Sequence, residues 1–202
     1  KTLVRNYMWY NIAGEVMEWA PNVRYCKVIL NGEYEGLYLM VETITNGDDC
    51  RLDLTDVAYG TAVTGYLLRE DRSVEADVDG IRDVYSYIER MLTIATDIEI
   101  RYPKKPNLSE ELRKAIEQDF AAFEKTLYSY DYDTKDYGYW HYIDEQNFVD
   151  YYLINEFTLN IDAGSYSTYI YKDMSGKYKL AVWDFNNACG NYIEDDTGYN
   201  VT

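Results

Sequence analysis

Two predicted β-hairpins, one near each end of the chain, constrain the fold more than any other feature of the sequence. In the first, strands at residues 24–30 and 36–44 flank Asn31-Gly32, a pair that tolerates the positive φ angles of a tight hairpin turn. The second is expected from residues 167–172 and 177–183, with a turn between them. Since a hairpin returns the chain to its starting point, the segments before and after it must lie close together.

Helical patterns separate the hairpins. Residues 2–18 carry apolar side chains at helical spacing, and Pro21 ends that helix. Ser109 and Asp144 are suitable first residues for two later helices. These two helices are predicted at 109–129 and 145–160. A further helix is predicted at 81–96 and a strand at 64–69. This order predicts an α+β protein with a strand-rich part at 1–80 and a helical part at 81–202 that carries the last hairpin.

The net charge excludes several classes of partner. The formal charge is −17, from 19 Lys and Arg against 36 Asp and Glu. Such a surface repels nucleic acids and anionic membranes and attracts a cationic polypeptide. No apolar run approaches the roughly 20 residues that span a bilayer.

Several common chemistries lack the residues they need. His141 is the single histidine, and the three cysteines, Cys26, Cys50 and Cys189, fit no zinc-binding spacing. We therefore expect free thiols. Neither GxxxxGK[ST] nor GxGxxG occurs, which excludes the P-loop and the usual glycine-rich nucleotide loops.

Carboxylate chemistry remains. Asp162 follows the helix predicted at 145–160, and Asp184 ends the second strand of the last hairpin. The hairpin can bring both to one cleft. Phosphoryl transfer needs such a pair, with one carboxylate to orient the attacking hydroxyl and one to hold Mg²⁺ against phosphate oxygens. The alternative is that both residues serve only as helix-end and turn residues.

Five stretches of the sequence resemble the CotH kinase family. They occur in family order: Asn31–Ile44 (NGEYEGLYLMVETI), Thr64–Asp71 (TGYLLRED), Phe148–Asp162 (FVDYYLINEFTLNID), Ser167–Asp173 (STYIYKD) and Val182–Asn191 (VWDFNNACGN). The opening TLVRN also fits. The resemblance implies an atypical protein kinase-like fold and Mg-ATP-dependent phosphorylation of Ser-containing proteins. In spore formers the substrates are coat proteins with basic, Ser-rich tracts, which agrees with the acidic charge.

The resemblance also implies roles for single residues. Asp162 matches the catalytic aspartate that orients the substrate hydroxyl, and Asp184 matches the metal-binding aspartate. Asn186 stands where many members have a second Asp, and its carbonyl oxygen can still serve Mg²⁺ or Mn²⁺. Ser167 stands where a metal-binding Asn is expected, which places a second metal in question.

The nucleotide contacts are less specific. Glu42 matches a strand glutamate of the family and is a candidate contact in the nucleotide-binding lobe. Arg5 and Arg51 are candidate contacts for phosphate. The alternative for all three is that they are surface charges. The family's segment before Thr2 normally supplies further residues of this lobe, so we expect a truncated lobe here. The implied location is extracellular, at the cell surface or in the spore coat.

Two other functions fit the residues. A non-catalytic surface or coat module would keep the kinase-like shape for protein binding, and the residues at 167 and 186 favour it. A carbohydrate-binding module would use exposed Tyr and Trp, for which the loop at 128–142 is a candidate. Residues 75–80 resemble the start of a calcium loop, but Ser86 would stand where the bidentate Glu is required.

Overall fold

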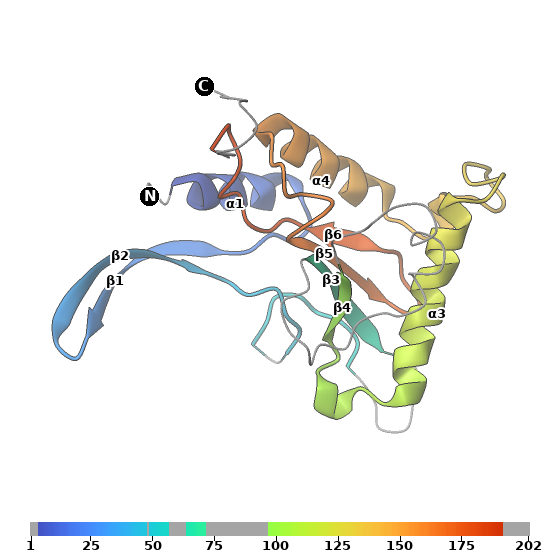
Figure 1. Ribbon diagram of the computed structural model, residues 1–202, viewed down its shortest axis with the longest axis horizontal. Helices are drawn as coiled ribbons and strands as arrows, with labels where there is room; N and C mark the ends of the chain where they lie inside the picture. Colours follow the sequence, from blue (N-terminus) through green and yellow to red (C-terminus); the bar gives the residue numbers. More distant parts are fainter. Residues whose placement is uncertain (1–3, 48, 57–63, 72–96, 192–202) are drawn as a thin grey trace.

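The computed structural model (Figure 1) describes residues 4–47, 49–56, 64–71 and 97–191. It combines helices with antiparallel strands, as predicted for an α+β protein. The elements are α1 (Val4–Val16), β1 (Val23–Leu30), β2 (Glu33–Val41), β3 (Gly65–Asp71), β4 (Asp97–Tyr102), η1 (Lys105–Asn107), α3 (Glu110–Leu127), η2 (Tyr139–His141), α4 (Glu145–Thr158), β5 (Thr168–Asp173) and β6 (Lys179–Ala181). The predicted helix at 81–96 and the acidic stretch at 75–80 lie outside the described residues.

The first hairpin is a two-stranded ribbon, β1–β2, that projects away from the rest of the molecule (Figure 1). Asn31 and Gly32 have φ angles of 53° and 88°, so the predicted turn is confirmed. Strand β2 begins at Glu33 rather than Gly36, because the two-residue turn leaves Glu33 paired with Leu30.

The remaining strands form one antiparallel sheet in the order β4-β3-β5-β6. Strand β4 was not predicted. It alternates charged and apolar residues and pairs with β3 along the edge of the sheet. The sheet therefore combines β3, from the predicted strand-rich part, with β5 and β6 from the helical part. The division at residue 80 and the two-lobed arrangement stay predictions.

Each face of this sheet packs against its own hydrophobic core. On one face, Tyr66, Leu68, Ile170 and Leu180 pack against residues of α1, α3 and α4. The other face packs against Trp19 and apolar residues of the loop that follows β2: Leu67, Tyr169, Tyr171 and Ala181 contact Ile44, Leu52 and Leu54. Because successive side chains of a strand point to opposite faces, β3 and β5 contribute apolar side chains to both cores, Tyr66 and Ile170 to one and Leu67, Tyr169 and Tyr171 to the other.

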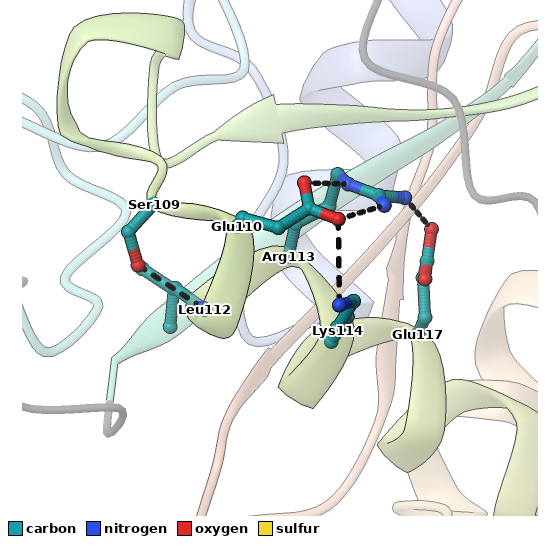
Figure 2. A network of polar contacts seen from close by, with 6 residues as sticks. All are labelled: Ser109, Glu110, Leu112, Arg113, Lys114 and Glu117. Atoms are coloured by element: carbon teal, nitrogen blue, oxygen red, sulfur yellow. Dashed lines mark hydrogen bonds and ion pairs between the residues drawn. The ribbon is translucent and has the colours of Figure 1, made fainter.

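The start of α3 follows its predicted cap. Figure 2 shows the Ser109 hydroxyl accepting a hydrogen bond from the amide of Leu112 at 3.1 Å, and Arg113 bridging Glu110 and the buried Glu117. Asp144 caps α4 in the same way, through the amide of Asn147 at 3.1 Å. Both caps satisfy backbone donors that would otherwise lack a partner at a helix start.

A buried polar network joins α3 to the sheet. Lys172 on β5 is 5% exposed and lies 2.7 Å from Asp119 of α3. Asp119 also accepts a hydrogen bond from Tyr66 at 2.5 Å, and the Tyr66 hydroxyl contacts that of Tyr178 at 2.7 Å. Burial, together with the neighbouring Tyr178 and Asp119, raises the pKa of Tyr66 far above its usual range. Both tyrosines therefore stay neutral, and Lys172 is the cation of the group.

The cysteine prediction is confirmed: Cys26, Cys50 and Cys189 are free. Within the ranges that the structure describes, no helix has the length and apolar character to cross a membrane.

Candidate active site

Asp162 lies in a loop between α4 and β5 that is held by backbone hydrogen bonds. Helix α4 ends at Thr158, and its capping residue Leu159 turns the chain with a φ of 50°. The amide of Asn160 then donates back to the carbonyl of Asn155 at 3.0 Å. The amides of residues 165 and 166 both donate to the carbonyl oxygen of Asp162, at 3.1 and 2.7 Å. The Asp162 backbone is therefore fixed, and its half-buried side chain extends from a rigid turn.

Asp184 lies shortly after β6, which ends at Ala181, and has a left-handed backbone. Its φ is 55°, which costs a non-glycine residue free energy and so marks a candidate functional position. Helix α1 supports this conformation: the amide of Asp184 donates to the Tyr10 hydroxyl at 2.8 Å, and the amide of Phe185 donates to Asn6 Oδ1 at 2.7 Å. Phe185 is fully buried and anchors the loop in the core.

Three contacts bring these two loops together. Asn187 Nδ2 donates to Asp162 Oδ2 at 2.7 Å, and Asn160 Nδ2 lies 3.4 Å from the carbonyl oxygen of Asp184. The amide of Cys189 donates to the carbonyl of Thr158 at the end of α4, at 2.6 Å. The hairpin thus returns the chain to the end of α4, as the sequence indicated.

The two carboxylates share one pattern of contacts. Asp162 Oδ2 accepts from Asn187, and Asp184 Oδ1 accepts from the amide of Asn186 at 3.0 Å. Among the described residues, the second oxygen of each aspartate has no hydrogen-bond partner. Each carboxylate therefore has one oxygen that fixes its orientation and one that is available to a ligand.

The donor set fits a hydrated divalent cation. Across the described ranges, no cluster of three or more His, Cys, Asp or Glu side chains could enclose a metal ion. Mg²⁺ does not require such a cluster, because it commonly takes one or two carboxylates and completes its shell with water and phosphate oxygens. The unengaged oxygen of Asp184 and the exposed side chain of Asn186 are donors of that type.

Ser167 lies immediately before β5. It is half-buried and has a φ of 51°, the third left-handed residue between the end of α4 and Asp184, after Leu159 and Gly164. The neighbouring Thr168 hydroxyl accepts from the amide of Gly164 at 2.9 Å, which closes the 162–168 loop. No described contact joins Ser167 to either aspartate, so its role as a metal ligand stays a prediction.

Glu42 and Arg51 form an ion pair at the base of the ribbon. The Arg51 guanidinium donates to Glu42 at 2.7 Å and to the carbonyl of Ala20, and it lies over the Trp19 ring. Glu42 also accepts from the amide of Asn22 at 2.9 Å. Burial raises the pKa of Glu42, but the bonds and charge of Arg51 outweigh this and lower it. Their described contacts are with each other, with Trp19 and with the backbone, and none is to Asp162 or Asp184. Their role as nucleotide contacts stays a prediction.

Arg5 lies on α1 beside Asn6, the residue that holds the amide of Phe185. It is half-buried and makes no ion pair within the described residues. Its proposed contact with phosphate stays a prediction.

Sequence reasoning missed the polar residues that support the two aspartates. Asn6 and Tyr10 hold the Asp184 loop, and Asn160 and Asn187 link it to the Asp162 loop. A recognisable pattern was present, because asparagines gather around both aspartates in NID and DFNN. Their amides donate and accept in loops that lack regular backbone pairing.

Comparison with known proteins assigns the chain to a family. No curated protein matches the chain. A model of the CotH kinase protein family matches residues 1–201, which is nearly the entire sequence. The chain therefore belongs to the CotH kinase protein family.

Proposed function

We propose that this protein is a Mg-ATP-dependent phosphotransferase that phosphorylates Ser, or Thr, of other proteins. The observation that carries the proposal is the Asn187–Asp162 hydrogen bond, which ties the loop of one aspartate to the loop of the other while each carboxylate keeps an unengaged oxygen. Family membership supports the same class of reaction.

Each residue has a distinct part in this reaction. Asp162 accepts a hydrogen bond from the substrate hydroxyl and takes its proton as the hydroxyl oxygen bonds to the γ-phosphorus. The bond from that phosphorus to the bridging oxygen breaks, and ADP leaves. Asp184 would hold Mg²⁺ or Mn²⁺ together with Asn186, and Ser167 is a further candidate. The bound ion would neutralise the phosphate charge that opposes attack.

Charge supports a basic protein substrate. With a net charge of −17, the surface attracts a Lys- or Arg-rich, Ser-containing polypeptide and repels nucleic acid. Arg5 would then meet the nucleotide phosphates, while Glu42 and Arg51 would shape the base of the ribbon as part of the nucleotide-binding region. We place the substrates among secreted, cell-surface or spore coat proteins.

The test is phosphate transfer from γ-labelled ATP to a basic Ser-rich peptide by the full-length protein with Mg²⁺ or Mn²⁺. Asp162→Ala should abolish transfer and leave nucleotide binding intact, whereas Asp184→Ala should weaken metal-dependent nucleotide binding as well. Asp136→Ala is the matched control, because Asp136 is an exposed aspartate of the 128–142 loop. Transfer by both site variants at the wild-type rate would refute the proposal.

A non-catalytic binding module is the second candidate. It is favoured by the residues at 167 and 186 and by the apolar side chains exposed on the ribbon, among them Ile29, Tyr34 and Met40 at 67%, 62% and 59%. Exposed apolar patches of this kind mark protein contacts. Partner binding that persists in the Asp162→Ala, Asp184→Ala double variant, with no transfer by the wild type, would favour this function.

A further inference from the structure

We infer that Asn187 is a positioning residue that aims Asp162 at the substrate hydroxyl and couples it to the metal-binding loop. The inference rests on the proposed function and deepens it. Its basis is the 2.7 Å hydrogen bond from Asn187 Nδ2 to Asp162 Oδ2, between residues on opposite sides of the last hairpin.

The backbone that carries Asn187 is held independently of Asp162. The amide of Ala188 donates to the carbonyl of Phe185 at 3.2 Å, and the amide of Cys189 donates to Thr158 at 2.6 Å. The Asn191 side chain closes the loop by donating to the carbonyl of Asn186 at 2.8 Å. The Asn187 amide is thus presented by a fixed loop, and its hydrogen bond limits the rotation of the Asp162 carboxylate.

The chemistry of an amide donor suits this task. The NH₂ group of Asn only donates, so it pairs with a carboxylate oxygen and fixes the rotation of that carboxylate. It carries no charge, so it leaves the carboxylate able to accept a proton at its second oxygen. A Lys or Arg in this place would hold the carboxylate as firmly but would reduce its basicity through the added positive charge.

The loop also gives Asn187 a coupling role. The same short turn carries Asp184, whose Oδ1 accepts from the amide of Asn186, and Asn187 follows directly. The hydrogen bond from Asn187 therefore fixes the orientation of the Asp162 carboxylate relative to the Asp184 loop. Correct orientation of a catalytic group within a fraction of an ångström strongly affects rate.

The kinetic test compares four variants of the full-length protein. Asn187→Ala should lower kcat about 10- to 100-fold, the range for lost supporting contacts, with the KM for Mg-ATP within about threefold. Asn187→Asp should lower kcat further, because it sets carboxylate against carboxylate. Asn187→Gln keeps the amide donor and should recover part of kcat. Asn11→Ala, which removes an exposed amide from α1, is the control and should behave as wild type.

An NMR readout keeps this inference separate from the proposed function. In ¹⁵N-labelled protein, the side-chain NH₂ resonances of Asn187 should shift in Asp162→Asn and stay unchanged in Asp136→Ala. If the wild type transfers no phosphate, the proposed function fails. Independently of activity, an Asn187 resonance that Asp162→Asn leaves unchanged overturns the contact itself. If the wild type is active, an Asn187→Ala kcat within twofold of wild type, or a raised KM with kcat unchanged, overturns the positioning role.

Discussion

Replacing Lys172 by Met tests whether the buried network holds α3 on the sheet that carries the two aspartate loops. The ammonium group lies 2.7 and 2.9 Å from the two oxygens of Asp119 and 4.5 Å from the centre of the Tyr178 ring. Met fills a similar volume without the charge. The variant therefore leaves Asp119 with its hydrogen bond from Tyr66 and without its counter-ion.

The expected magnitude follows from the burial of the two partners. Breaking a buried ion pair by removing one partner costs about 3–5 kcal/mol. The Asp119 side chain is 23% exposed and keeps the Tyr66 bond, so the lower end applies, about 3 kcal/mol. Replacing both partners, as Lys172→Met with Asp119→Leu, removes both charges and should cost less than the two single changes added together.

The assay is urea unfolding followed by far-UV circular dichroism, with the free energy of unfolding extrapolated to water. Lys114→Met is the matched control, because Lys114 is a 61% exposed lysine of α3 in a surface pair with Glu110 (Figure 2), and such pairs contribute under about 1 kcal/mol. A loss below about 1 kcal/mol for Lys172→Met, or strict additivity in the double variant, would refute the reasoning.

Three further predictions concern pH, a helix cap and the Asp184 loop. Burial, with the nearby charge of Glu70, raises the pKa of Glu124 from 4.5 to about 7. Because the pKa of Glu124 is higher in the folded than in the unfolded protein, the free energy of unfolding should fall as the pH rises from about 4.5 to 7. After discounting for solvent screening, we expect a fall of about 1–2 kcal/mol that Glu124→Gln removes in thermal melts across this range. Ser109→Ala removes the cap of α3 and should lower the free energy of unfolding by about 1 kcal/mol in urea titrations, and an unchanged midpoint would contradict the capping role. Tyr10→Phe leaves the amide of Asp184 without its acceptor and should lower the free energy of unfolding by about 1–3 kcal/mol. It should also weaken Mg-ATP binding measured by calorimetry; wild-type affinity would show that this hydrogen bond does not support metal binding.

Much of the secondary structure could be predicted because local interactions decide it. The Asn31-Gly32 turn, the caps at Ser109 and Asp144 and the strand after residue 64 were all predicted from short patterns, and the structure confirms them. Strand β4 could not be predicted, because its charged residues are accommodated only by pairing with β3, to which Arg69 contributes an ion pair with the buried Glu99.

The candidate site divides in the same way. Asp162 and Asp184 could be chosen from the sequence, because carboxylates placed around a hairpin are recognisable in a family motif. Their supporting residues could not, because Tyr10 and Asn6 reach the site from α1 at the other end of the chain. Glu42 and Arg51 were also chosen from the sequence, as candidate nucleotide contacts, and that role stays a prediction. The structure describes contacts of these two residues with each other and with the backbone at residues 20 and 22.

The sequence by itself determined the turns and the helix starts, since each depends on side chains a few residues apart, and it identified Asp162 and Asp184 as candidates through a family motif. The tertiary structure alone decided that β3 lies between β4 and β5, that Lys172 is buried against Asp119, and that Asn187 reaches Asp162. Those contacts join residues distant along the chain, and their partners are selected by how the sheet pairs and how the helices pack on it. Local sequence patterns carry no information about that choice of partner.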